Sequence, residues 1–179
     1  MIQKHCPLIV LAAICLMGAL QNSAAAAADW KEFSSAECKF KCLFPISPRE
    51  KQATVKAAGG ELKTHAFIAE VDVHTAYGVD YTEYPPGMKL VANKQTLDRA
   101  EASVVTKYDG KVTFQQDTKV GNYPAREFEY VAGGKANYSG RMKIIIVGQR
   151  VYELLVIFLP ADPHPADRDR FLQSFQIQD

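Results

Sequence analysis

Two apolar runs between Arg141 and Pro160, joined by Gly148-Gln149, constrain this chain more than any other stretch. A glycine at the first central position of a two-residue loop suits a type II′ turn, whose twist matches that of paired strands. The pattern therefore predicts a β-hairpin in which Val147 lies opposite Arg150.

Pleat alternation gives this hairpin two faces, and both are mostly apolar. One face carries Met142, Ile144, Ile146, Val151, Glu153 and Leu155. The other carries Lys143, Ile145, Val147, Tyr152, Leu154, Val156 and Phe158. A hairpin in a one-sided sheet would show a clean polar face, so we expect further layers to cover both sides. The hairpin is thus predicted to be the centre of a layered α+β domain.

The first 28 residues have the organisation of a secretory signal peptide. Lys4 precedes a short apolar run over 7–20, and a small-residue stretch ends in Ala26-Ala27-Ala28. The apolar run is shorter than the roughly 20 residues that a membrane span needs. We therefore expect export to the periplasm or the extracellular space, with cleavage after Ala28.

A lipoprotein signal is the alternative form of export. Cys15 would then carry the lipid, but the residue before a lipidated cysteine is normally small, whereas Ile14 is large. The alanine run also offers a better cleavage site than the sequence around Cys15.

The length of 179 residues indicates one domain, which would span 29–179 after cleavage. Without Lys4 the chain keeps 20 basic residues against 20 acidic ones. This balance gives no electrostatic reason to expect nucleic acid as a partner. No later apolar run has the length of a transmembrane helix.

Cys38 and Cys42 are the two cysteines that remain in the exported chain. An oxidising compartment makes them candidates for a disulfide. Four residues of extended chain would separate their Cα atoms by about 13 Å, whereas a disulfide needs them within about 7 Å. The bond is therefore possible only if the chain folds back at Cys38. Free or intermolecular thiols are an alternative. Metal binding or thiol chemistry is a third, although two thiols alone would leave a zinc shell half filled.

The rest of the chain alternates short strands with two helical segments. The helix over 93–108 has an apolar stripe of Leu97, Ala100, Val104 and Tyr108, and Gly110 is expected as its C′ residue. A second, shorter helix is predicted over 167–174. Strands are predicted over 39–44, 52–58, 61–69, 70–84, 111–120, 125–132, 137–147 and 150–158, with a last short strand near 175–177.

Several of these features together resemble the PsbP-like proteins and their exported bacterial relatives. They are Trp30-x-x-Phe33, Phe40-x-x-x-Phe44-Pro45, the helix near 93–108, Gly121-x-x-Pro124-x-Arg126-Glu127, Arg141, Arg150-Val151-Tyr152 and Phe171-x-x-Ser174-Phe175. The resemblance implies an α/β/α sandwich around a mainly antiparallel β-sheet flanked by helices.

The same resemblance implies a binding or assembly-assisting role rather than an active site. Some family members assist assembly of the photosynthetic oxygen-evolving machinery, and one distant relative binds a small GTPase. Cys38 departs from the family pattern, since a small or polar residue is usual at such a turn.

Asp72 and His74 are the candidate metal ligands. They lie two residues apart on the same face of the strand predicted over 70–84, beside Glu70 and with Asp80 further along. Carboxylate and imidazole groups on one face suit a divalent cation. The competing interpretation is that this face is simply solvated, and His164 with its flanking aspartates is a weaker case of the same kind.

No catalytic motif emerges from the sequence. Nucleophilic hydrolysis needs a positioned histidine beside a serine or cysteine, and neither a G-x-S-x-G elbow nor a phosphate-binding loop is present. Cofactors are therefore not expected.

Arg126, Arg141 and Arg150 are expected to form cross-strand pairs with Glu127, Glu129 and Glu153.

Two interpretations hold for the tyrosines near loops: they form an interface or they cap the core. These are Tyr77, Tyr81, Tyr84, Tyr123 and Tyr138.

The whole sequence predicts an exported, soluble module that binds a protein partner and has no catalysis of its own. The alternatives are a metal-binding or thiol-dependent envelope protein and a structural, oligomeric envelope component.

Overall fold

A computed structural model describes residues 29–57, 60–88, 90–134, 138–161 and 164–178. The predicted signal peptide and its cleavage site near Ala28 lie outside these residues. The elements are β1 (Lys31–Ser35), β2 (Phe40–Phe44), β3 (Arg49–Ala57), β4 (Gly60–Glu70), β5 (Ala76–Glu83), α1 (Lys94–Lys107), β6 (Lys111–Val120), β7 (Tyr123–Val131), β8 (Ser139–Val147), β9 (Arg150–Phe158), α2 (Pro165–Ser174) and β10 (Gln176–Ile177).

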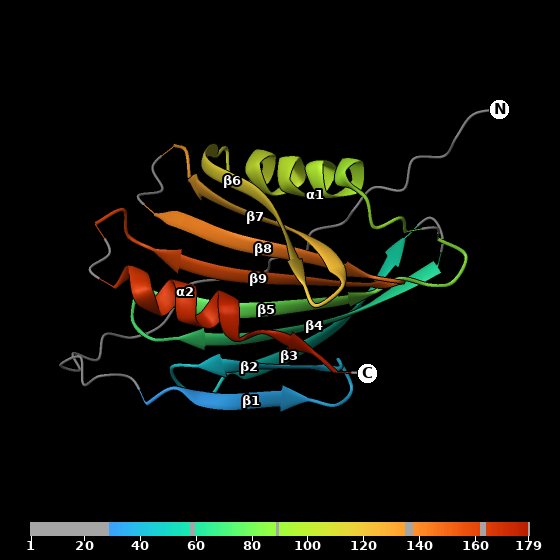
Figure 1. The fold of residues 1–179 in the computed structure, drawn as a ribbon, viewed down its shortest axis with the longest axis horizontal. Helices are drawn as coiled ribbons and strands as arrows, with labels where there is room; N and C mark the ends of the chain where they lie inside the picture. Colours follow the sequence, from blue (N-terminus) through green and yellow to red (C-terminus); the bar gives the residue numbers. More distant parts are fainter. Residues whose placement is uncertain (1–28, 58–59, 89, 135–137, 162–163, 179) are drawn as a thin grey trace.

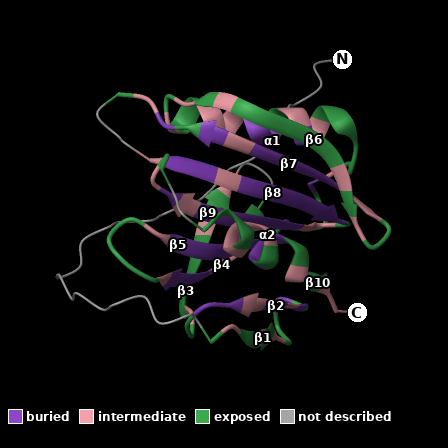
Figure 2. Ribbon diagram, turned by 60° about the vertical axis from the view of Figure 1, so that its left-hand side comes forward, coloured by how far each residue is buried: buried purple, intermediate pink, exposed green. Residues whose placement is uncertain are grey.

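Seven strands form one antiparallel sheet in the order β3-β4-β5-β9-β8-β7-β6 (Figure 1). The predicted hairpin is confirmed: β8 and β9 pair with Val147 opposite Arg150, and Gly148 has the positive φ of 60° that its turn requires. The hairpin occupies the middle of the sheet and is almost wholly buried (Figure 2). A mainly antiparallel β-sheet flanked by helices is therefore the architecture.

Each face of the large sheet has its own apolar core. The stripe of α1 predicted from the sequence packs against the hairpin face that carries Met142, Ile144, Ile146, Val151 and Leu155. The opposite face packs against α2 and against a second sheet of three strands in the order β1-β2-β10. Phe40, Cys42 and Phe44 of β2 point into that second core.

The ends of α1 follow local sequence signals. The side chain of Asn93 accepts a hydrogen bond from the Thr96 amide, which satisfies one of the free N–H groups at the helix start. At the other end, the amide of Gly110 donates to the Val105 carbonyl and that of Asp109 to the Thr106 carbonyl. This is a Schellman motif with Asp109 at C′, at φ 47°. The expectation of Gly110 at C′ was therefore wrong by one position.

The predicted strand over 70–84 is interrupted. β4 ends at Glu70 and β5 begins at Ala76, and the intervening residues form an exposed turn closed by a hydrogen bond from the Val71 amide to the Thr75 carbonyl. The alternation of polar and apolar residues continues through this turn, which is why it resembled a continuous strand. Within the described residues, no helix is long and apolar enough to cross a membrane.

Candidate binding cleft between helix α1 and strand β6

A cleft of about 460 Å³ lies where α1 overhangs the edge of the large sheet. Its apolar lining comes from Ala102, Val105 and Val112, and Gln115 adds an uncharged polar group. The remaining lining residues are charged: Lys94, Asp98, Glu101 and Arg126. A surface of this mixed character can hold a side chain that has both an apolar stem and a charged end.

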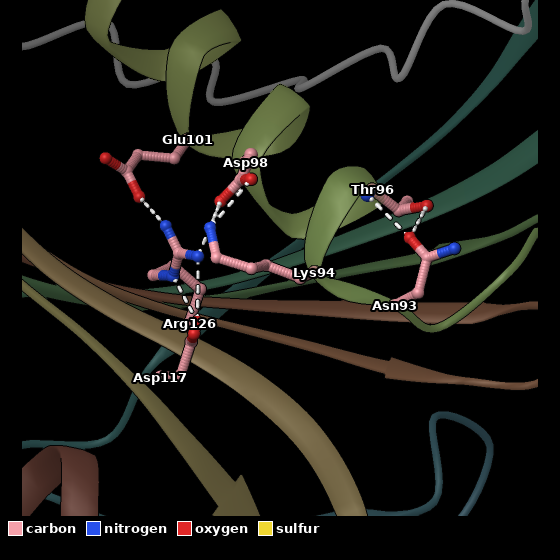
Figure 3. Close-up of polar contacts among 7 residues, drawn as sticks. All are labelled: Asn93, Lys94, Thr96, Asp98, Glu101, Asp117 and Arg126. Carbon is pink, nitrogen blue, oxygen red and sulfur yellow. Dashed lines mark hydrogen bonds and ion pairs between the residues drawn. The ribbon is translucent and has the colours of Figure 1, made fainter.

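Arg126 is the centre of the charged part of the cleft (Figure 3). Its Nη1 donates to Glu101 at 2.6 Å, its Nη2 donates to Asp98 at 2.6 Å, and its Nε donates to Asp117 at 2.8 Å. The Arg126 side chain is only 1% exposed. The guanidinium thus joins α1, β6 and β7 through three ion pairs.

Secondary structure brings these groups together. Asp98 and Glu101 are three residues apart on α1 and so lie on the same side of the helix. Asp117 on β6 lies directly opposite Arg126 on β7 in the sheet register. Pleat alternation turns Arg126 toward α1, because its neighbour Ala125 belongs to the core on the other face.

The ion pairs shift the protonation equilibria of their members. Burial acts to lower the pKa of the Arg126 guanidinium, but its hydrogen bonds to Glu101, Asp98 and Asp117 outweigh burial and raise it. Hydrogen bonds from Lys94 and Arg126 lower the pKa of Asp98. Both pKa shifts favour the charged forms of Arg126 and Asp98 at neutral pH.

The carboxylates outnumber the cations in this cluster. Asp98, Glu101 and Asp117 face Lys94 and Arg126, which leaves a net charge of −1. Lys94 and Arg126 bind Asp98, whereas Glu101 and Asp117 each bind Arg126 through one oxygen, Oε2 and Oδ1 respectively. Among the described contacts, Glu101 Oε1 and Asp117 Oδ2 accept no hydrogen bond. The cleft therefore offers acceptor oxygens to a further cation.

Strand β6 forms the outer boundary of the cleft and is the last strand of the sheet. Most of its residues are exposed (Figure 2), including Phe114, which is 40% exposed. The pairing of β6 with β7 has a bulge between Val112 and Phe114 and is regular from Phe114 to Val120. The outer edge of this regular part carries no other strand of the sheet.

A second ion-pair network lies on the opposite face of the sheet. Buried Glu127 accepts hydrogen bonds from Arg141 and lies 3.2 Å from the ammonium of Lys143. Arg141 also donates to Asp169 of α2, and Lys143 donates to the carbonyl of Leu172. This network attaches α2 to the sheet, so its role is structural.

The predicted arginine pairs are partly confirmed. Arg141 does pair with Glu127 across strands, but Arg126 binds carboxylates of α1 and β6, and Arg150 donates to the hydroxyl of Tyr152. The prediction for Arg126 was wrong because cross-strand reasoning leaves out the helix above the sheet. Two acidic residues one helical turn apart, Asp98 and Glu101, are the sequence signal that could have indicated the cluster.

The structure places the two candidate metal ligands in the β4–β5 turn instead of on a strand face. The Asp72 carboxylate accepts a hydrogen bond from the His74 amide at 2.7 Å, which is a local turn contact. Asp80 lies apart from them, on β5 opposite Glu153. Among the described residues, no three metal-ligating side chains come together.

Cys38 and Cys42 are both buried and both free thiols in this structure. Burial raises the pKa of Cys38 to about 11 and raises that of Cys42 further. A thiolate is thus strongly disfavoured at both positions. The structure shows two separate thiols, and the disulfide between them remains a prediction.

The tyrosines fit core capping better than an interface. Tyr77 and Tyr81 are buried in the core on the α2 side of the sheet, and Tyr84 is buried in the core on the α1 side. Tyr123 and Tyr138 are half-buried at the margins of those cores. None of the five forms part of the α1–β6 cleft.

Comparison with known proteins is informative about the fold alone. No protein-family model matches the sequence, and no curated protein matches it. The solution structure of cyanobacterial PsbP (CyanoP) from Synechocystis sp. PCC 6803 is similar, with a TM-score of 0.60 at 11% sequence identity over 88% of this chain and 97% of that one. This chain therefore has a PsbP-like fold.

A second similar structure is a protein of unknown function, PA94 from Pseudomonas aeruginosa, described as a putative regulator. Its TM-score is 0.42 at 12% identity, over 78% of this chain and 92% of that one. A likeness this distant supports no inference about this chain.

Proposed function

We propose that this protein is an exported binding or assembly-assisting module that acts through protein–protein contacts at the α1–β6 cleft and has no catalytic activity. The observation that carries the proposal is the pair of unused carboxylate oxygens, on Glu101 and Asp117, in a cleft beside an open strand edge. The three ion pairs of Arg126 hold these carboxylates in place before a partner binds, which lowers the cost of binding.

The PsbP-like fold supports the finer architectural inference as well. We infer that α1, the large sheet and α2 form the three layers of an α/β/α sandwich of PsbP-like type. The small sheet β1-β2-β10 would share the layer of α2, since both contribute to the same apolar core. This arrangement leaves the α1–β6 edge as an open strand edge of the sandwich that lies beside a cluster of carboxylates.

The alternatives have less support. A thiol-dependent function needs a thiolate, which burial disfavours at Cys38 and Cys42. A metal-dependent function at Asp72 and His74 would compete with the hydrogen bond that the Asp72 carboxylate accepts within its own turn. A structural, oligomeric component of the envelope would use copies of itself as the partner, and the test below separates that case.

Site-specific photocrosslinking in the cells that export the protein tests the proposal. A photoreactive amino acid replaces Gln115 in the cleft, and the matched control places it at Gln52 on the opposite edge strand, β3. We expect a defined adduct with another protein from position 115 and none from position 52. Equal labelling from both positions, or adducts that contain only this chain, would overturn the proposal.

A further inference from the structure

We infer that the partner docks as an extended segment that adds a strand to the outer edge of β6 and places a lysine or arginine in the α1–β6 cleft. The inference rests on the proposed function and deepens it, because it specifies the conformation and the charge of the segment that binds.

The first support is the open edge of β6. This strand pairs with β7 and has no neighbour on its other side within the described sheet. Its regular part, Phe114–Val120, presents enough backbone N–H and C=O groups for a short incoming strand. Addition of a peptide strand to a sheet edge is a recurrent mode of recognition, in which the backbone gives affinity and alternate side chains give specificity.

The second support is the position of the cleft relative to that edge. Side chains of an added strand would alternate between the two faces of the sheet. Those on the α1 side would enter the space bounded by Ala102 and Val105 of the helix and by Gln115 of β6. A basic side chain there could pack its stem on the two apolar residues and direct its charged end to Glu101 and Asp117.

The third support is charge. The cluster around Arg126 has a net charge of −1, and the oxygens it leaves unused belong to carboxylates. Glu101 is 10% exposed, so a cation that reached it would be partly shielded from water. Lys111 and Lys119 lie near the two ends of β6 and would repel a basic residue placed opposite either end. A basic residue of the added strand is therefore favoured opposite the middle of β6.

The fourth support comes from the other face of the same edge. The exposed ring of Phe114 points to the α2 side, where the Arg141 guanidinium lies 5.6 Å from its centroid. Apolar residues of an added strand would lie beside this ring and shield it. A segment in which β-branched residues alternate with a basic one therefore matches both faces of the edge.

The opposite edge strand fits such a segment less well. β3 carries Arg49, Lys51 and Lys56 against a single acidic residue, Glu50, and would repel a basic segment. Glu50 is in addition bound to His65 at 2.8 Å. The structure therefore assigns the docking edge to β6.

The test uses a synthetic probe and the protein as purified from the cells that export it. The probe is a fluorescein-labelled, amidated heptapeptide, Thr-Val-Lys-Val-Thr-Val-Thr, whose lysine lies on one face and whose valines lie on the other. Two matched peptides replace the lysine with norleucine or carry N-methyl groups on alternate residues, which removes outward N–H donors. Binding is followed by fluorescence anisotropy.

We expect the parent peptide to bind, and each of the matched peptides to bind about tenfold more weakly or less. We also expect Asp117→Asn, which keeps an acceptor for Arg126, to weaken binding of the parent peptide and not of the norleucine peptide. Glu61→Gln removes an exposed carboxylate of β4 and should leave binding unchanged. Thermal melts of both variants verify that they fold.

Each contrary result is specific. Equal binding of the N-methylated peptide would overturn strand addition, and equal binding of the norleucine peptide would overturn the basic side chain. Amide hydrogen exchange, measured with and without the parent peptide, should slow on β6, and slowing on β3 instead would overturn the choice of edge. Crosslinks from position 115 without any peptide binding would overturn this inference and leave the proposed function standing, whereas loss of the crosslinks would remove both.

Discussion

Asp80 on β5 lies directly opposite Glu153 on β9, so two carboxyl groups share one position of the central sheet. Glu153 is only 6% exposed, and the positive charge of Lys107 acts to lower the pKa of both carboxyl groups. Burial and the neighbouring Asp80 raise the pKa of Glu153 to about 8, and burial raises the pKa of Asp80 to about 7. The sequence predicted that Asp80 lies on a solvated strand face, whereas in the structure this residue is half-buried.

This pair should make the protein less stable as the pH rises. The folded state holds protons that the unfolded chain releases, so the free energy of unfolding falls between about pH 4 and pH 8. Glu153→Gln should flatten that slope and stabilise the protein by about 1–3 kcal/mol near pH 8. Urea titrations across this pH range provide the measurement, with Glu61→Gln as an exposed control. An unchanged slope in Glu153→Gln would show that the pair does not titrate as described.

Arg126 is predicted to be the most costly single charge to remove. Arg126→Met would leave Asp98, Glu101 and Asp117 without their common cation, and loss of one partner from a buried ion pair typically costs about 3–5 kcal/mol. Arg126→Lys should recover only part of this stability, because an ammonium cannot reproduce the fork geometry. Chemical denaturation measures the difference, and the exposed Arg99→Met should fall within about 0.5 kcal/mol of the parent protein. A loss at Arg126 no greater than that at Arg99 would contradict the geometry.

The parts of the fold that follow from short-range patterns could be predicted from the sequence. The β8–β9 hairpin was predictable because Gly148 fixes the turn and the alternation around it fixes the register. Helix α1 was predictable because its apolar stripe and its Asn93 cap lie within one segment. In both cases the determining contacts join residues that are close in the chain.

The cleft could not be predicted in the same way. Arg126 meets Asp98 and Glu101 only because α1 packs above β7, and strand alternation carries no information about a helix that precedes the strand. Asp80 was misplaced for a similar reason: it lies in the sheet beside β9, where its register partner Glu153 is more than seventy residues away in the chain. Charged groups within a sheet therefore needed the tertiary structure to be interpreted.

Gly140 should not tolerate any side chain. A Cβ atom there would lie 2.6 Å from the Tyr130 hydroxyl oxygen and still closer to two ring carbons, and Tyr130 is fully buried. Gly140→Ala should therefore destabilise the protein by about 1–3 kcal/mol, the usual cost of overpacking a core. Gly121→Ala is a useful comparison, since its Cβ would meet no atom within 4 Å but its φ of 58° favours glycine. Thermal denaturation measures the loss. Adding Tyr130→Leu to Gly140→Ala removes the clashing ring, so the extra cost of Gly140→Ala should be smaller in the Tyr130→Leu background. An equal cost in both backgrounds would exclude the steric explanation.

Cys38 and Cys42 should react with thiol reagents only when the protein unfolds. Both side chains are buried, and the raised pKa of each thiol keeps the thiolate scarce near neutral pH. A colorimetric thiol assay on the protein as isolated from its cells should give little signal in buffer and the full count of both thiols in concentrated guanidinium chloride. Rapid reaction in buffer would contradict the burial. No thiols in the denatured protein would show that the cysteines are bonded to each other.

Lys143 should control how firmly α2 is attached to the sheet. Its ammonium donates to the Leu172 carbonyl at 3.0 Å and lies 3.2 Å from Glu127, so it links the last turn of α2 to two central strands. Lys143→Met keeps the apolar stem but leaves Glu127 with Arg141 as its only remaining cation among the described contacts, and we expect a loss of about 1–3 kcal/mol. Hydrogen exchange measured by mass spectrometry should show faster exchange in α2 and β10 and little change in α1. Uniformly faster exchange across both faces would instead indicate a general loss of stability and contradict a local role for Lys143.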